Sequence, residues 1–198
     1  MTGQPWFVVR PAVAGDLDAL VDLFASVVEE RLWLGAEPPL DRAAQRRRFV
    51  ERMEEGGPGE SLVAVSEEGS EMIGHVGMDL APYNVASLGM IVGAEWRGRG
   101  VGAALVDAAV DWSRHRGAHK LTLQVWPHNT VARRLYRRHG FVEEGVLRRH
   151  YRRRSGELWD AVVMGLVLDE TSPGSSLPSG DRRPLSEDPV PTWSPPSP

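Results

Sequence analysis

The sequence predicts a single mixed α/β domain in which helices flank a mixed β-sheet. The chain has 198 residues, of which 41% are hydrophobic and 25% charged, the usual balance of a folded domain. Segments with strand periodicity alternate with amphipathic helical segments, without an internal repeat, up to residue 168. The segment 169–198 contains 8 of the 15 prolines. We therefore expect one domain over residues 1–168 and a disordered Pro/Ser-rich tail over residues 169–198.

The first third of the chain predicts one strand and two helices. Residues 6–10 have strand character and are followed by a proline, and residues 16–30 carry apolar side chains at helical spacing. A loop marked by glycine and proline at 35–39 leads to a second helix over 41–55. The breaker residues of 56–59 then end that helix.

The middle of the chain predicts a hairpin followed by a strand and a helix. Residues 61–66 and 72–80 read as two strands, with 67–71 as the turn between them. A further strand over 86–92 runs into a glycine-rich turn and a helix over 100–116. Strand, turn and helix are therefore contiguous at this point.

The last part of the domain predicts three strands and a short helix. Residues 121–126 alternate between two faces, which is typical of a strand. A helix follows from about residue 130 to residue 139, with Asn129 as its N-cap and Gly140 directly after its C-cap. Two final strands are expected at 141–151 and 158–168, joined by a connection at 152–156.

Composition excludes several classes of site. The chain has no cysteine, so it has no disulfide, no thiolate metal site and no cysteine nucleophile, and we expect a cytoplasmic protein. Its six histidines show no metal-ligand spacing, so we expect no metal. No segment approaches the ~20 apolar residues that a bilayer requires, and the first residues lack the pattern of a secretion signal. We therefore expect no membrane span.

Charge is unevenly distributed along the chain. Residues 1–96 contain 7 basic and 16 acidic side chains, whereas residues 97–154 contain 14 basic and 4 acidic ones. The basic half is suited to bind an anion, although arginines on solvated helix faces would give the same count. Its aromatic residues Trp126, Tyr136 and Tyr151 are not interleaved as a base-stacking platform, so we do not expect nucleic-acid binding.

A glycine-rich turn at the start of the helix over 100–116 predicts an anion site. It comprises Arg97, Gly98, Arg99, Gly100, Val101 and Gly102. Such a turn exposes backbone N–H groups at the positive end of a helix, with few side chains to obstruct a phosphate. The turn also fits a dinucleotide pattern, but it lies in mid-chain and the next strand ends without an acidic residue. A P-loop is excluded because no Gly-Lys-Ser/Thr follows.

A second group of residues surrounds the short helix near residue 130. Asn129 and Tyr136 are seven positions apart and lie within about 20° of each other on a helix, so one ligand could contact both. The alternative is that Asn129 only caps the helix and Tyr136 belongs to the core. The full group is Asn129, Ala132, Leu135, Tyr136, Gly140 and Phe141.

Together, these two groups resemble the GNAT superfamily of N-acetyltransferases. The acetyl-CoA signature [RQ]-x-x-G-x-[GA] matches Arg97, Gly100 and Gly102. The motif N-x-x-A-x-x-L-Y-x-x-x-G-F matches the second group without a gap. The resemblance covers about residues 6–168 and implies a GNAT-like splayed mixed sheet, with acetyl-CoA held between two strands.

The resemblance implies a role for each matched residue. The backbone amides of the turn from Arg97 to Gly102 would bind the pyrophosphate. The backbone of Met90, Ile91 and Val92 would pair with the pantetheine arm, which Asn129 would also contact. Tyr136 would act as the general acid that protonates the departing thiolate.

The sequence departs from the family where a general base is expected. Many relatives carry a glutamate on the strand before the signature or just before the valine of the next strand, but here Ser87 lies on the first strand and Gln124 precedes Val125. Water remains a candidate, together with Glu30, His75, Asp79 and Glu95.

The family implies acetyl transfer to the primary amine of a small molecule, amino acid or peptide, by direct attack in a ternary complex. The alternative is a catalytically silent acyl-CoA-binding module. The sequence leaves open the acceptor and the oligomeric state, a homodimer included.

Overall fold

The computed structural model describes residues 6–54, 56–66 and 71–168. Of the expected features, the tail over 169–198 and all but the last residue of the hairpin turn over 67–71 lie outside these residues. Within the described part, no helix is long and apolar enough to cross a membrane.

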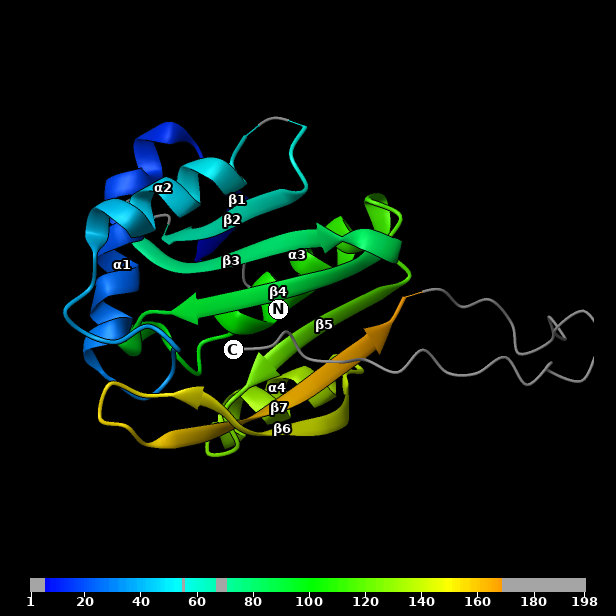
Figure 1. Cartoon of the computed structure of the whole chain (residues 1–198). Coiled ribbons are helices and arrows are strands. Elements are labelled where there is room, and N and C mark those ends of the chain that lie inside the picture. Colours follow the sequence, from blue (N-terminus) through cyan, green and yellow to red (C-terminus); the bar gives the residue numbers. More distant parts are fainter. Residues whose placement is uncertain (1–5, 55, 67–70, 169–198) are drawn as a thin grey trace, which may run out of the picture.

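A seven-stranded sheet in the order β1-β2-β3-β4-β5-β7-β6 forms the centre of the domain (Figure 1). All neighbouring strands are antiparallel except β4 and β5, which run parallel, so the predicted mixed α/β class is confirmed. The strands are β1 Phe7–Pro11, β2 Gly59–Ser66, β3 Met72–Ala81, β4 Val85–Val92, β5 Lys120–Val125, β6 Val142–Arg152 and β7 Leu158–Val167.

In the described part of the chain, four α-helices cover the two faces of the sheet. They are α1 Leu17–Glu29, α2 Arg42–Arg52, α3 Val101–His115 and α4 Thr130–Arg138. The apolar side chains of α1 and α2 pack on one face of β2 and β3, whereas α3 and α4 pack on the other face of the sheet (Figure 1). Single 3-10 turns occur at Ala14–Asp16, Pro82–Asn84 and Ala94–Trp96.

The second helix is shorter than expected. Asp41 caps α2 by accepting a hydrogen bond from the backbone N–H of Ala44 at 2.9 Å. The sequence predicted that this helix would extend to about residue 55, but α2 ends at Arg52 because Met53 leaves the helical conformation, with φ −89° and ψ 1°. The helix therefore ends before the chain reaches the glycine and proline residues at 56–59.

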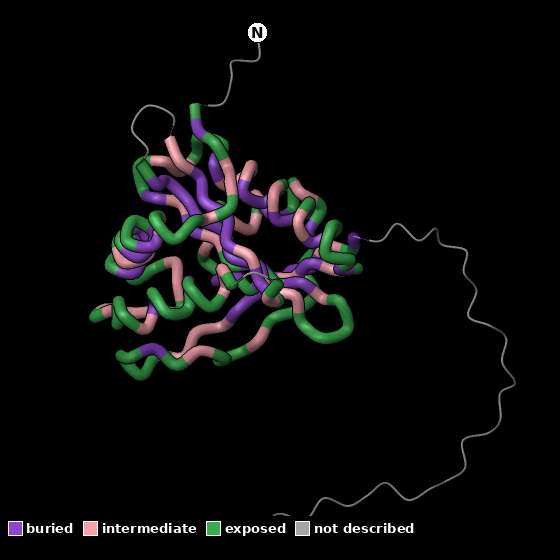
Figure 2. The backbone as a smooth tube through the Cα atoms, turned by 90° about the horizontal axis from the view of Figure 1, so that it is seen from above, coloured by how far each residue is buried: buried purple, intermediate pink, exposed green. Residues whose placement is uncertain are grey.

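Burial is concentrated in the central strands and in the helix faces turned toward them (Figure 2). Large side chains such as Phe49, Phe141 and Ile73 are almost fully buried. The edge strand β6, in contrast, is exposed over most of its length. The core thus occupies both layers between the helices and the central strands.

The sheet splits between β4 and β5. The two strands pair only from Val85 opposite Lys120 to Ser87 opposite Thr122. Beyond this point β4 remains paired with β3, and β5 remains paired with β7. The backbone edges of β4 and β5 therefore diverge into a V, which confirms the expected splayed sheet.

Candidate functional site

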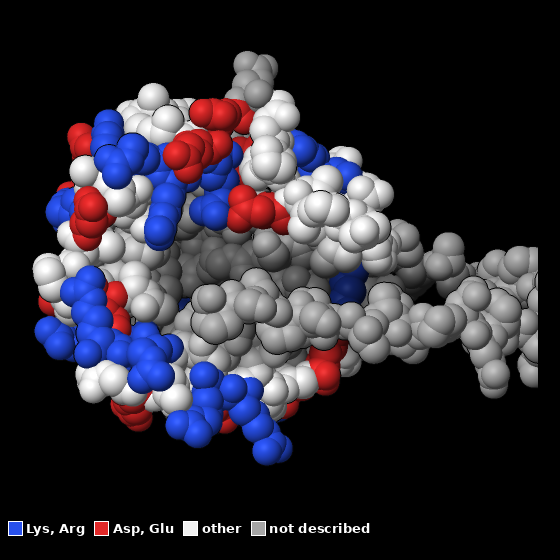
Figure 3. Space-filling view, in the orientation of Figure 1, with Lys and Arg blue, Asp and Glu red and all other residues white. Residues whose placement is uncertain are grey.

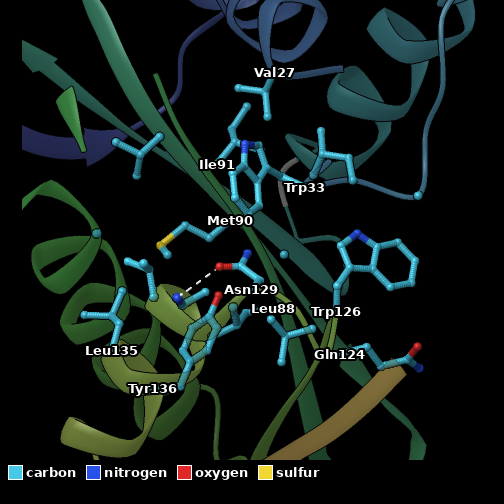
Figure 4. A pocket seen from close by; sticks show the side chains of 18 of the residues that line it. Val27, Trp33, Leu88, Met90, Ile91, Gln124, Trp126, Asn129, Leu135 and Tyr136 are labelled. Carbon is cyan, nitrogen blue, oxygen red and sulfur yellow. Dashed lines mark hydrogen bonds between the residues drawn. The ribbon is translucent and has the colours of Figure 1, made fainter. Parts of the chain in front are cut away.

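A cavity of about 450 Å³ occupies the V. Its walls come from β4, from the ends of β5 and β6, from β7, from the first turn of α3, from α4, and from the segment after α1. In Figure 4, Leu135 and Tyr136 lie on one side of the cavity and Trp33 and Trp126 on the other, with Met90 between them. We call these two sides the α4 side and the tryptophan side.

The β4 wall presents backbone groups to the cavity. Met90, Ile91 and Val92 all line it, and Ile91 buries its side chain in the core beneath α1. Because β4 pairs with β5 only up to Ser87, the β4 edge that faces β5 has no strand partner from Leu88 onward within the described residues. An extended ligand could occupy the position of the missing strand.

The glycine turn is open at the start of α3. Gly98 and Gly100 adopt positive φ angles of 74° and 90°. Among the described residues, apart from the chain neighbours of each glycine, no heavy atom lies within 4 Å of where a Cβ would stand. Gly102 lines the cavity in the first turn of α3, beside Leu135. Backbone N–H groups at this helix start are therefore available to an anion.

The other members of the turn contribute differently. Val101 is fully buried and belongs to the core. Arg99 is exposed and stacks its guanidinium over the ring of Trp96, at 5.1 Å from the ring centroid.

The side chain of Arg97 is held by Glu30 at the end of α1. Its two terminal nitrogens donate to the two carboxylate oxygens of Glu30 at 2.7 and 2.6 Å, and its Nε donates to the carbonyl of Val92 at 3.0 Å. Trp33 also donates its ring N–H to Glu30. Hydrogen bonding from Arg97 lowers the pKa of Glu30, which makes this carboxylate a weak base.

The predicted pair of Asn129 and Tyr136 meets at the cavity. Asn129 caps α4 by accepting a hydrogen bond from the N–H of Ala132 at 3.1 Å, and it also lines the cavity, so its structural and ligand-binding interpretations are compatible. Tyr136 is only 5% exposed, lines the same cavity and packs on Phe141. Burial raises the pKa of Tyr136, so its hydroxyl stays protonated and can donate a proton or hydrogen bond.

Three of the four candidate bases lie away from the cavity lining. His75 is buried against Phe49 with a hydrogen-bond contact to Ser61, and burial lowers the pKa of His75 to about 3. Asp79 pairs with Arg52 at 2.7 Å. Glu95 is exposed on the 3-10 turn after β4. Among the described lining residues there is no carboxylate and no histidine.

The tryptophan side of the cavity was not foreseen from the sequence. Trp33 comes from the segment after α1, Trp126 follows β5, and Tyr151 comes from β6. The rings of Trp126 and Tyr151 meet edge to face at 5.0 Å, and the Tyr151 hydroxyl donates to Oε1 of Gln124 at 2.7 Å. Only the packed fold brings these aromatic residues together, since their positions follow no motif.

A buried arginine ties the tryptophan side together. Arg153, in the β6–β7 connection, is 5% exposed and donates to the carbonyls of Leu34 and Gly35 at 3.0 and 3.2 Å. It also pairs with Glu37 at 3.2 Å and stacks on Trp159 at 4.3 Å. We call this set of contacts the Arg153 clasp.

Charge is distributed unevenly around the hollow face of the molecule. In Figure 3, Lys and Arg side chains dominate the lower rim, over β6 and its connection to β7, and the upper rim near α2 carries both signs. The exposed arginines of β6 and of its connection to β7 include Arg148, Arg149, Arg152 and Arg154. In the described part of the chain, no group of three or more His, Asp or Glu side chains is placed to hold a metal ion.

Comparison with protein families gives a match to the model of the acetyltransferase (GNAT) family over residues 22–141. The L-amino acid N-acetyltransferase AaaT of Escherichia coli is 28% identical over 168 residues, covering 81% of this chain and 97% of that protein.

Among solved structures, a GCN5-related N-acetyltransferase from Kribbella flavida is 27% identical with a TM-score of 0.73, covering 82% of this chain and 98% of that one. A GNAT superfamily phosphinothricin acetyltransferase from Sinorhizobium meliloti, solved in complex with AcCoA, has a TM-score of 0.73 at 22% identity, covering 83% and 90% of the two chains.

Proposed function

The chain belongs to the GNAT acetyltransferase family and is an N-acetyltransferase, and from this premise we propose that it acetylates a small primary amine with acetyl-CoA in one ternary complex. The observation that carries the proposal is the unpaired edge of β4, which leads to the open glycine turn at the start of α3. The two features offer binding groups for an extended amide chain and for a pyrophosphate.

The residues of the V fit acetyl-CoA. The backbone of Met90, Ile91 and Val92 would pair with the pantetheine arm as an added strand would pair with β4. The amide of Asn129 would contact the same arm. The amides of the turn would bind the pyrophosphate at the positive end of α3, from Arg97, Gly98, Arg99, Gly100, Val101 and Gly102.

Tyr136 is the catalytic residue of the proposal. When bound, acetyl-CoA supplies the electrophilic thioester carbon. The raised pKa of Tyr136 keeps a proton on its hydroxyl, which would be given to the departing thiolate sulfur. The burial of this side chain among Phe141 and the core of the α4 side fixes its position.

The acceptor amine would have to enter as the free base. Glu30 lies next to the lining residues Arg97 and Trp33, but its lowered pKa and its two hydrogen bonds from Arg97 make it a poor proton acceptor. Water at the open mouth of the V would take the proton that the amine releases after attack. The rate at a fixed total amine concentration should therefore rise with pH up to the pKa of the amine itself.

Release of CoA thiol during a screen of amines, amino acids and N-terminal peptides tests the function. We expect steady turnover with at least one amine, together with binding of acetyl-CoA measured by calorimetry. Binding of acetyl-CoA without turnover on any amine would favour the silent acyl-CoA-binding module instead. Absence of both would contradict the assigned cavity.

A further inference from the structure

The tryptophan side of the cavity is suited to an apolar, ring-bearing acceptor. Trp33 and Trp126 stand on this side, and Tyr151 packs on Trp126 (Figure 4). Leu34 and Ala161 complete the apolar lining. Aromatic rings stack favourably on such walls, and burying apolar area there stabilises the complex.

Arg97, which lines the cavity, and Arg153, directly behind the lining, are both paired with carboxylates. Arg97 is the only ionised side chain among the described lining residues, and both of its terminal nitrogens are bound to Glu30. Arg153 lies behind the lining, where it is buried by Trp159 and bonded to Glu37 and to two backbone carbonyls. A carboxylate on the acceptor would therefore have to displace Glu30 or remain without a charged partner among the described lining residues.

The polar groups that remain free for the acceptor are neutral. Gln124 accepts from the Tyr151 hydroxyl through Oε1, which orients its amide N–H groups away from that bond. An amide and a phenol can hydrogen-bond an amine or a neutral carbonyl, but they do not offset the cost of burying an anion.

Resting on the function proposed above, we propose that the acceptor is an arylalkyl primary amine without an α-carboxylate. Its ring packs on Trp33 and Trp126, and its amine points toward the β4 wall, where the thioester carbon would be placed. The free amine attacks that carbon to form the carbon–nitrogen bond, and the carbon–sulfur bond breaks. Tyr136 protonates the thiolate, the nitrogen loses one proton to water, and Tyr136 regains a proton from water. This acceptor class differs from that in the name of the Escherichia coli relative, an L-amino acid N-acetyltransferase.

Matched acceptors test the proposal on the full-length protein. Phenylethylamine, phenylalanine amide and phenylalanine have the same phenyl ring and a primary amine, and only phenylalanine bears a carboxylate. We expect kcat/KM for the amine and the amide to exceed that for phenylalanine by roughly 100-fold or more, since an unpaired buried charge is costly. Similar values for phenylalanine and its amide would overturn the proposal, and so would a larger kcat/KM for a small anionic amino acid than for phenylethylamine.

Binding measurements separate this proposal from the proposed function. Calorimetry with the CoA-bound protein should show phenylethylamine binding more tightly than phenylalanine, whether or not turnover occurs. If acetyl-CoA binds and no amine is acetylated, the proposed function fails, and the order of these two affinities still supports or overturns the acceptor class.

A variant that releases Arg97 provides a gain-of-function test. Glu30→Gln removes the carboxylate that occupies the guanidinium, so the freed cation can pair with an acceptor carboxylate. We expect the ratio of kcat/KM for phenylalanine to that for phenylethylamine to rise by about tenfold or more. Glu29→Gln, an exposed position on the same helix, is the matched control and should leave the ratio unchanged. An unchanged ratio in a folded Glu30→Gln protein would contradict the role assigned to this ion pair.

Discussion

Tyr136 combines two properties that a general acid needs, a cavity position and a retained proton. Burial disfavours the phenolate and raises the pKa of Tyr136. Tyr136→Phe removes the hydroxyl and keeps the ring that packs on Phe141. We expect kcat to fall by roughly 10²- to 10⁴-fold, with the Kd for acetyl-CoA changed little. Assays of thiol release give kcat, and calorimetry gives the Kd for acetyl-CoA. An unchanged kcat would show that Tyr136 takes no part in the chemistry.

His75 connects a single residue to the pH dependence of stability. Its folded-state pKa is about 3, below the ordinary 6.5, because burial disfavours the charged ring and the Arg52 guanidinium adds a smaller repulsion. Below pH 6.5 the ring of His75 is therefore protonated in the unfolded chain but stays neutral in the folded chain. The free energy of unfolding is thus highest above pH 6.5 and declines as the pH falls toward 3.

The size of this effect can be measured by denaturant unfolding. Each pH unit below the ordinary pKa costs about 1.4 kcal/mol, so between pH 8 and pH 5 the wild type should lose about 2 kcal/mol more stability than His75→Gln. Because other groups titrate alike in both proteins, their contributions cancel in this difference. Equal losses in the two proteins would show that His75 does not titrate in this way.

At the level of elements, the start of α3 joins a glycine turn to the cavity. A Cβ on Gly102 would stand 3.1 Å from Cδ2 of Leu135 and 3.6 Å from Cε of Met90, inside the space proposed for the cofactor. Gly102→Val should therefore raise the Kd for acetyl-CoA by roughly tenfold or more, with little change in Tm. Ala103→Val places the same side chain in the same turn, outside the cavity lining, and serves as the control.

A second variant, at Gly100 in the turn itself, distinguishes backbone strain from obstruction of the acetyl-CoA site. Gly100→Val should also weaken acetyl-CoA binding, but its φ of 90° makes any side chain strained, so a fall in Tm should accompany the loss. If Gly102→Val binds acetyl-CoA as tightly as the wild type does, the anion site is misplaced.

The Arg153 clasp holds the segment after α1 against the β6–β7 connection. Arg153→Met removes the donor to the carbonyls of Leu34 and Gly35 and the cation paired with Glu37, whose Oε2 still accepts from the backbone N–H of Arg154. The backbone of Leu34 and Gly35 therefore loses the side chain that fixes its position. We expect the KM for the preferred amine to rise about tenfold, with kcat and the Kd for acetyl-CoA nearly unchanged. Arg153→Lys should restore part of the effect. Arg152→Met, whose side chain bonds only within its own turn, is the control, and a general loss of Tm without a KM change would assign the clasp to stability alone.

The elements themselves could be predicted because their signals are local. Apolar periodicity located α1 and α3, and Asn129 with Gly140 marked the limits of α4. The contacts that shape the acceptor side could not be predicted in the same way. Arg97 and Glu30 are 67 residues apart, and Arg153 and Leu34 are 119 apart, so no local pattern relates them. The sequence itself shows that the glutamates expected on the two strands are absent. Only the fold shows that Arg97 occupies the carboxylate of Glu30.

Acidic and basic residues are separated along the sequence. Residues 1–96 carry a balance of −9 and residues 97–154 one of +10, and the second segment contains the glycine turn, α4 and the arginines of the lower rim in Figure 3. Such a field raises the encounter rate of an anionic ligand beyond what the binding contacts alone would give. Acetyl-CoA carries several phosphate charges, so its association should depend on the basic half.

Salt should therefore reduce the efficiency of the enzyme toward acetyl-CoA. The Debye length falls from about 30 Å at 0.01 M to about 10 Å at 0.1 M ionic strength, which screens exposed charges but leaves buried pairs such as that of Arg153 largely intact. We expect kcat/KM for acetyl-CoA to fall steadily over this range while Tm changes little. S-acetylpantetheine, which has the same thioester arm without phosphates, should show a kcat/KM almost independent of salt. If both thioesters lose efficiency in parallel, salt acts on the chemistry or the fold, and the basic half has no steering role.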